Sequence, residues 1–159
     1  MIAAASEYHI AEVLNGLCAQ NVAEFEVMQG GYDPVLALEL VQDWIKGEGA
    51  VGLVVLKARV AECVGGLRPI NPGVAIFWLL GTTGWPRRCL REVTQAGRTL
   101  VETALANGYH RLEGHALSTN QFSGRWYRKL GFEREGVRRS FGRRGEDVEI
   151  YGRVKHGIG

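Results

Sequence analysis

Apolar positions in the first part of the chain recur at helical spacing. Residues 2–5 form a short apolar run that suits the start of a strand. Ser6 then fits a helix N-cap with Glu7 in the first turn, where an acidic side chain favours the helix dipole. The residues that follow at intervals of three and four are Ile10, Leu14, Leu17 and Cys18. Together they predict an amphipathic helix.

Two further helices are expected before residue 50. A short helical stretch covers 22–28 and ends at Gly30. Asp33 and Pro34 then form a strong start signal, because Asp caps free amides and Pro suits the first helical position. The third helix is expected to run to Lys46, and its apolar face is expected to carry Leu36, Leu40 and Trp44.

The pattern then changes to β-branched runs. Residues 50–57 and 60–67 are two such runs joined by two residues, which predicts a hairpin with its turn at 58–59. Prolines at 69 and 72 are expected to break the chain. The run at 74–80 lacks polar alternation, which is typical of a central strand buried on both faces.

Helices and strands alternate through the rest of the chain. A long helix is expected to end near Asn107, and a strand at 110–117 and a helix at 119–130 follow it. Two last strands are expected near 134–141 and 147–154. The order predicts a mixed α/β fold, and the absence of a Pro-, Gly- or Ser-rich linker predicts one domain over 1–159.

Composition excludes several classes of protein. The chain has 159 residues, of which 46% are apolar and 23% charged, so it can fill a core and is not a disordered chain. Its apolar runs are shorter than the roughly 20 residues of a membrane span, and its N-terminus lacks the pattern of a signal peptide. Three widely spaced cysteines disfavour a disulfide framework or a metal site. We therefore expect a cytoplasmic protein without a bound metal or membrane contact.

Positive charge gathers toward the C-terminus. Residues 125–155 contain ten Lys or Arg and five Asp or Glu, whereas 1–124 contain nine and twelve. Such a basic third can attract an anionic cofactor, a nucleic acid or an acidic protein, and it can equally be a solvated strand face. A nucleic-acid partner is disfavoured because acidic residues interrupt the basic stretch at Glu135, Glu146, Asp147 and Glu149.

One segment carries a family resemblance. It reads Asn-Gln-Phe-Ser-Gly-Arg-Trp-Tyr-Arg-Lys-Leu-Gly-Phe over 120–132, after a helix that closes at Gly108 and before a final pair of strands. In motif and in element order this resembles the GCN5-related N-acetyltransferase (GNAT) family. The resemblance implies a mixed, mostly antiparallel seven-strand sheet with helices on both faces. It also implies acetyl-CoA as co-substrate and an amine as acceptor: a protein N-terminus, a lysine or a small amine.

The family chemistry assigns roles to individual residues. In the family, the cofactor lies where the fourth and fifth strands separate, and a tyrosine faces its thiolate. Tyr127 matches that tyrosine and is the candidate acid, although it can also be an aromatic that packs on its neighbours. Asn120 matches an asparagine near the pantetheine arm and equally fits an ordinary helix start. Backbone groups of Leu79, Leu80 and Gly81 match the strand that meets the pantetheine and the oxyanion.

The expected pyrophosphate loop departs from the family pattern. The family places Arg/Gln-x-x-Gly-x-Gly/Ala at the start of the long helix, and this position falls on Arg88, Cys89, Leu90, Arg91, Glu92 and Val93. Glycines there let the backbone approach phosphate closely. Here arginine side chains either bind the phosphate in their place or the site is inactive.

The catalytic base is a choice between two residues on one strand face. Glu113 and His115 are two residues apart on the predicted strand at 110–117, so they share a face. Either can remove a proton from the amine, directly or through water. The alternative is that Glu113 pairs with a nearby arginine and His115 is a satisfied histidine.

A second function class stays open at this stage. Trp-Leu-Leu-Gly-Thr at 78–82 resembles small GNAT-like proteins encoded among the morphogenesis genes of short-tailed bacteriophages. Because the glycine loop is broken, a catalytically silent protein that acts in virion assembly or protein contact is the alternative to an acetyltransferase.

Overall fold

A computed structural model describes residues 1–156 and contains seven strands and five helices in that range. The strands are β1 (Ile2–Ala4), β2 (Val51–Lys57), β3 (Val60–Asn71), β4 (Val74–Gly81), β5 (Arg111–Leu117), β6 (Glu133–Arg138) and β7 (Val148–Val154). The helices are α1 (Glu7–Asn15), α2 (Ala19–Gln29), α3 (Pro34–Trp44), α4 (Trp85–Ala106) and α5 (Gln121–Lys129).

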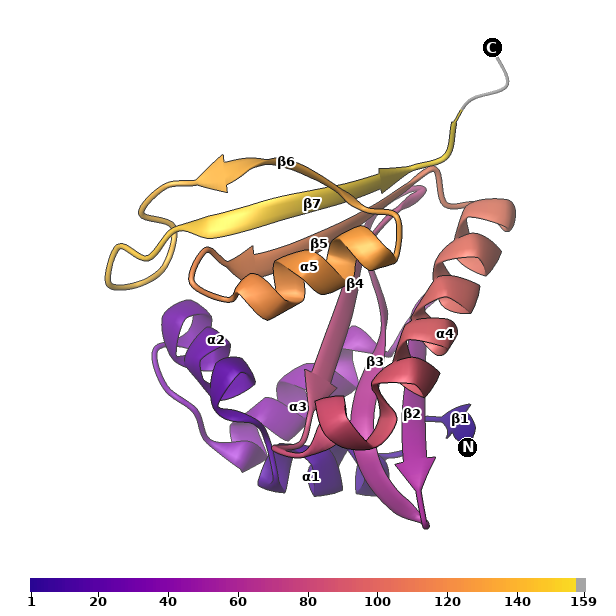
Figure 1. Cartoon of the computed structure of the whole chain (residues 1–159), viewed down its shortest axis with the longest axis vertical. Helices are drawn as coiled ribbons and strands as arrows, with labels where there is room; N and C mark the ends of the chain where they lie inside the picture. The colour runs from indigo at the N-terminus through magenta and orange to yellow at the C-terminus, as the bar shows by residue number, and fades with distance from the viewer. Residues whose placement is uncertain (157–159) are drawn as a thin grey trace.

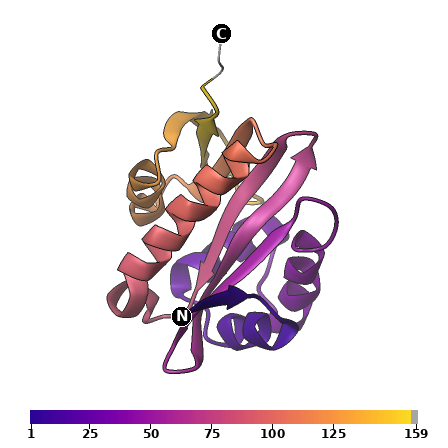
Figure 2. The same cartoon turned by 90° about the vertical axis from the view of Figure 1, so that its right-hand side faces the viewer.

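All strands belong to one sheet, in the order β1-β2-β3-β4-β5-β7-β6. Neighbouring strands are antiparallel except β4 and β5, which pair in parallel across the long crossover through α4. Helices α1 to α3 lie on one face of the β1–β4 part of the sheet, and α4 lies on the other (Figure 2). The predicted mixed, mostly antiparallel seven-strand fold is confirmed.

The two faces of the sheet bury separate cores, and β4 contributes to both. Phe77 belongs to the core under α4 and α5, whereas Trp78 and Leu80 belong to the core under α1 to α3. Successive side chains of a strand point to opposite faces, so a strand covered on both sides needs apolar residues at every position. This explains the uninterrupted apolar run of β4.

The predicted helix starts are present. The Ser6 side chain accepts a hydrogen bond from the backbone of His9 at the start of α1. Asp33 accepts bonds from the backbone amides of Val35 and Leu36 at the start of α3. The hairpin turn at Ala58-Arg59 is also found, with both residues at positive φ.

Several local expectations were wrong. The first helix ends at Asn15, so Leu17 and Cys18 lie outside it. Leu36 does not lie on the buried face of α3: its side chain is 66% exposed, and the helix buries Ala37 and Val41 against α1 and the sheet instead. Helix α3 ends at Trp44, before Lys46. Pro69 does not break the chain, because β3 continues to Asn71 through an irregularity in the register that accommodates the missing amide.

Within residues 1–156, no helix has both the length and the apolar character that a membrane crossing requires. Cys63 and Cys89 are buried thiols and Cys18 is half-buried, all three unbridged.

Candidate active site

The parallel pairing of β4 and β5 covers only the first three residues of each strand, Val74–Ile76 against Arg111–Glu113. Beyond these residues β4 continues to Gly81 and β5 to Leu117, and the two strands diverge (Figure 1). A cavity of about 220 Å³ fills the space between them. The divergence therefore leaves room for a cavity whose lining residues come from both faces of the sheet.

The cavity has a different set of walls on each face. On the α4 and α5 side its walls are aromatic and include Trp85, Phe122 and Trp126. On the α2 and α3 side they include Trp44, Trp78 and the polar residues Glu24, Arg68 and His115. An apolar passage with a few polar groups at one end is the usual form of a small-molecule site.

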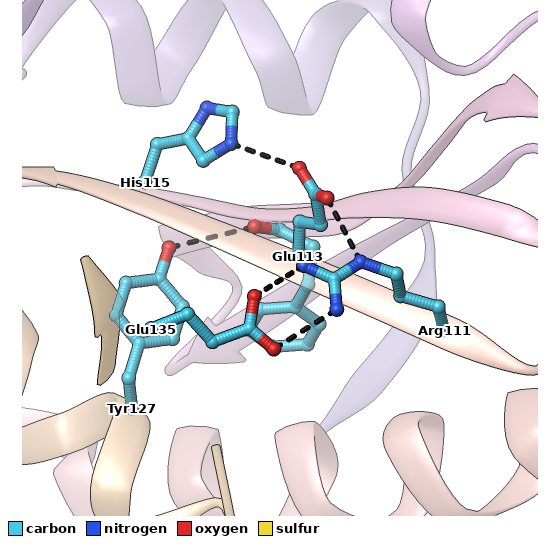
Figure 3. A network of polar contacts seen from close by, with 6 residues as sticks. Arg111, Glu113, His115, Tyr127 and Glu135 are labelled. Carbon is cyan, nitrogen blue, oxygen red and sulfur yellow. Dashed lines mark hydrogen bonds and ion pairs between the residues drawn. The ribbon is translucent and has the colours of Figure 1, made fainter. Parts of the chain in front are cut away.

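Tyr127 of α5 lies between the two sides. The side chain is buried, and its hydroxyl donates to the carbonyl oxygen of Phe77 over a long 3.5 Å contact (Figure 3). Burial and the nearby negative charge of Glu24 raise the pKa of Tyr127. The phenol is therefore protonated at neutral pH, as a proton donor must be.

Glu113 and His115 are brought together as the strand spacing predicted. The Nε2 atom of His115 lies 3.2 Å from Oε2 of Glu113, and both side chains lie on the side of β5 opposite Tyr127 (Figure 3). Burial and the positive charges of Arg138 and Arg68 lower the pKa of His115. The bond to Glu113 raises this pKa but does not fully offset the decrease. His115 is thus a neutral imidazole at neutral pH, with Glu113 placed to orient it.

Arg111 holds Glu113 in its charged form. Its Nε donates to Oε1 of Glu113 at 2.9 Å, and its two terminal nitrogens bind the carboxylate of Glu135 on β6 (Figure 3). Burial raises the pKa of Glu113, but the bonds from Arg111 and His115 outweigh burial and leave it below its ordinary value. Glu113 therefore has the arginine partner that was the alternative expectation, and it also contacts His115.

Glu24 is a cavity residue that sequence reasoning missed. It lies on α2, and its carboxylate accepts one bond from the side-chain amide of Asn21 and another from that of Asn120, each at 3.1 Å. Burial raises its pKa, and the two amide bonds oppose that rise. The Asn21-x-x-Glu24 spacing places both on one helix face, but only the folded chain brings Asn120 to them.

Asn120 caps α5. Its side-chain oxygen accepts from the backbone amide of Ser123 at 3.1 Å, and its amide nitrogen donates to the Ser123 hydroxyl and to Glu24. Although Asn120 lines the cavity, its hydrogen bonds are already made inside the protein. Its expected contact with a pantetheine arm stays a prediction.

The backbone of β4 offers one free position toward the gap. The amide of Gly81 donates to Asn21 at 3.0 Å and its carbonyl accepts from Cys18, so both groups are occupied. The amide of Thr82 donates to Glu62 on β3. Because strand residues alternate in the side to which their backbone groups point, Leu80 bonds toward β3 and Leu79 faces the gap.

The first turn of α4 carries Arg88, the first residue of the expected phosphate segment. The helix begins at Trp85 and has non-helical angles at Cys89, so Arg88 to Val93 lie around a kink inside the helix. Nη1 of Arg88 bonds Oε1 of Glu62 at 2.9 Å, and Glu62 is buried. The Thr82 hydroxyl donates to the other oxygen of Glu62. Arg88 is therefore already paired within the fold.

The remaining residues of that segment divide between core and surface. The side chains of Cys89 and Val93 are buried, and Leu90 packs partly against the same core. Glu92 pairs with Lys57 of β2, and Arg91 is exposed. Arg88 is exposed too, but its Nη1 is held by Glu62, whereas no ion pair holds Arg91 within residues 1–156. The cofactor contacts expected for this segment stay predictions.

The described part of the chain contains no group of three or more His, Cys, Asp or Glu side chains arranged to hold a metal ion. The cavity lining includes the imidazole of His115, the phenol of Tyr127 and Leu79 of β4.

Several solved structures that share this fold carry the names of N-acetyltransferases. No protein-family model and no curated protein sequence matches the chain. The structure superposes on ribosomal-protein-alanine N-acetyltransferase from Brucella melitensis with a TM-score of 0.72 and 16% identity, over 98% of this chain and 99% of that one. A variant of spermidine N-acetyltransferase SpeG from Vibrio cholerae gives 0.71 and 16%, over 97% and 94%. RimL, a ribosomal L7/L12 alpha-N-protein acetyltransferase in complex with coenzyme A, gives 0.72 and 17%, over 96% and 92%. At these identities the comparisons establish the fold.

Proposed function

We propose that the protein is an acetyl-CoA-dependent N-acetyltransferase that acts on a primary amine. The observation that carries this proposal is the pairing, across one cavity, of a neutral imidazole held by Glu113 and a protonated phenol at Tyr127. Direct transfer of an acetyl group from a thioester to an amine needs a proton acceptor on one side and a proton donor on the other.

Acetyl-CoA, when bound, supplies the acyl thioester, and the protein residues then have separate tasks. His115 accepts the proton that the attacking amine releases, and Glu113 stabilises the imidazolium that forms. The amide of Leu79 faces the gap and would be the fixed backbone donor for the negative charge that develops on the acyl oxygen. Tyr127 donates its proton to the departing thiolate.

The phosphates of the co-substrate are assigned to the N-terminal end of α4. Arg87 and Arg91 are exposed there, and helix-end amides favour an anion. Since Arg88 is bound to Glu62, Arg87 and Arg91 are the side chains we assign to phosphate, in place of the glycines of the family pattern. We place the reaction in the cytoplasm, where free thiols such as those of this chain persist.

The names of the structurally similar proteins suggest classes of amine acceptor. Their names specify ribosomal proteins and spermidine, so the fold serves both protein and small-molecule amines. For this chain we propose a protein N-terminus, a lysine or a small amine.

Calorimetric titration with acetyl-CoA, with CoA as the control, tests the first requirement of the proposal. We expect micromolar binding, on the order of −8 kcal/mol. The Arg91→Ala variant should bind more weakly. Lys155→Ala should bind like the wild type, because Lys155 is exposed and its backbone bonds His110, beyond the opposite end of α4. Absence of binding heat at high protein concentration contradicts the proposal.

The occupied residues of α4 favour a second candidate. Arg88 and Glu92 are both paired within the protein, and the buried Trp85 contacts Phe122 of α5 at a ring-centroid distance of 5.5 Å. These contacts fit a catalytically silent protein that kept the fold for protein contact, including a role in phage virion assembly. Such a protein would bind no acetyl-CoA in the same titration.

A further inference from the structure

Arg68 of β3 is a half-buried cation without an anionic partner. Its guanidinium lies over the ring of Trp44, 5.3 Å from the centroid, and it lines the cavity. Burial lowers the pKa of Arg68, and among residues 1–156 no carboxylate contributes an opposing effect. A cation–π contact uses only the face of the guanidinium, so its five N–H donors, which lie in the plane, are left for another group.

Two tryptophan side chains form the wall around Arg68. The indole N–H groups of Trp44 and Trp78 are buried, and neither has a hydrogen-bond partner in the described part of the chain. Both tryptophans line the cavity beside Arg68 and contact each other edge to face. Their burial seals both N–H groups from the cavity, so Arg68 is the charged donor of this wall that a ligand can reach.

The described lining of the cavity carries one cationic and one anionic side chain. Among the cavity-lining residues that the structure describes, Arg68 is the only Lys or Arg and Glu24 the only Asp or Glu. His115 belongs to the same cavity and is close enough to Arg68 for the arginine charge to lower its pKa. Because the Glu24 carboxylate already accepts bonds from Asn21 and Asn120, Arg68 is the charged group left to bind the other end of an amine that reacts at His115.

We propose that the acceptor is an amine that also carries a carboxylate, and that Arg68 binds this carboxylate while the amine lies at His115. The inference rests on the proposed acetyltransferase function and deepens it. A single guanidinium matches the charge and the two oxygens of one carboxylate. The cavity volume of about 220 Å³ is below the usual range for a drug-sized ligand, so it admits the end of a molecule such as the first residues of an acidic peptide.

The proposal excludes polyamines as preferred acceptors. A polycation such as spermidine would place a second ammonium group near Arg68, where like charges repel. The protein should therefore differ in acceptor from the spermidine N-acetyltransferase whose fold it shares.

The test compares three tripeptide amides that differ only in the middle residue, Ala-Asp-Ala, Ala-Asn-Ala and Ala-Lys-Ala, together with spermidine. For the wild type we expect kcat/KM for the Asp peptide to exceed that for the Asn peptide at least tenfold, and the Lys peptide and spermidine to be the poorest. Arg68→Met should bring the Asp-to-Asn ratio near one. Arg59→Gln removes an exposed charge far from the cavity and should keep the wild-type ratio.

Calorimetry of the Asp and Asn peptides without acetyl-CoA tests the carboxylate site independently of the proposed acetyltransferase activity. Suppose that acetyl transfer fails while the Asp peptide still binds at least tenfold more tightly than the Asn peptide, in a way that depends on Arg68. In that case Arg68 is the carboxylate site and the proposed acetyltransferase function is wrong. Equal binding or equal turnover of the two peptides, or a preference for spermidine, overturns the proposal. Arg68→Lys keeps the charge but loses the planar guanidinium, so we expect an Asp-to-Asn ratio between those of the wild type and the Met variant. This variant replaces Arg68→Met if the Met variant does not fold.

Discussion

The ring of Tyr127 lies directly against the backbone of Gly114: a Cβ atom at position 114 would come within 2.3 Å of Cε1 of the tyrosine. Gly114 stands between Glu113 and His115 on β5, so one strand segment orients the proposed base on one face and admits the proposed acid on the other. The close approach of ring and backbone is possible because glycine has no side chain.

Gly114→Ala should therefore displace Tyr127 without touching any polar group. We expect kcat to fall at least tenfold and the free energy of unfolding to fall by about 1–3 kcal/mol, the usual effect of overpacking a core. Steady-state kinetics and urea unfolding measure the two effects. Gly136→Ala is the matched control, because a Cβ there would meet nothing within 4 Å. Equal behaviour of both variants would show that the contact does not position Tyr127.

Tyr127→Phe tests the hydroxyl separately from the ring. The ring packs against Tyr151 and Phe132, and phenylalanine keeps these contacts. The free energy of unfolding should therefore change little. Loss of the proton donor should lower kcat by about 100-fold or more, while affinity for acetyl-CoA, measured by calorimetry, stays within about twofold. An unaltered rate removes Tyr127 from the role of acid.

The protonation of His115 gives a prediction with a definite sign. Because burial and the charges of Arg138 on β6 and Arg68 on β3 lower its pKa, while Glu113 on its own strand raises it, the imidazole should titrate below the ordinary value of about 6.5. The rate should be lost as pH falls through this pKa, since the protonated ring cannot accept a proton. Glu113→Gln removes the favourable partner, so the pKa should fall further and kcat should drop.

Proton NMR titration of the His115 ring measures that pKa directly in both variants. Arg139→Gln, which removes an exposed charge, serves as a control for general electrostatic effects. A His115 pKa above 6.5 in the wild type, or one that rises in Glu113→Gln, contradicts the assigned pairing.

Arg88 and Arg91 should respond to substitution in opposite ways. Arg88→Ala leaves the buried carboxylate of Glu62 with only the Thr82 hydroxyl as side-chain donor, so we expect a loss of about 1–2 kcal/mol in unfolding free energy. Arg91 is exposed, so Arg91→Ala should leave stability unchanged and weaken acetyl-CoA binding several-fold. Thermal unfolding and calorimetry of both variants check this. If Arg91→Ala binds acetyl-CoA like the wild type, Arg91 does not contact the phosphates.

The local rules of chain structure predicted most of the fold. Asp33 and Pro34 marked a helix start, and the apolar run at 74–80 marked a doubly covered strand, because each signal depends on neighbouring residues alone. Leu36 was placed wrongly because helical periodicity gives the spacing of an apolar face but not which turn the neighbouring helix covers.

The site was harder to predict than the fold. Glu113 and His115 were found because they share one strand face. Glu24, Asn21 and Arg68 were missed because their meeting depends on how α2 and β3 lie against the end of β5, and no spacing in the sequence encodes that. Likewise, the pairing of Arg88 with Glu62 joins residues 26 positions apart.

The central claim is that the cavity between β4 and β5 transfers acetyl groups, and the release of free CoA thiol from acetyl-CoA tests it most directly. The rate should be followed with and without the Ala-Asp-Ala peptide amide, and mass spectrometry should identify the product. The account predicts thiol release that depends on the peptide, one added acetyl group on its amine, and loss of both in His115→Ala. Binding of acetyl-CoA without peptide-dependent thiol release, or equal rates in wild type and His115→Ala, would contradict it.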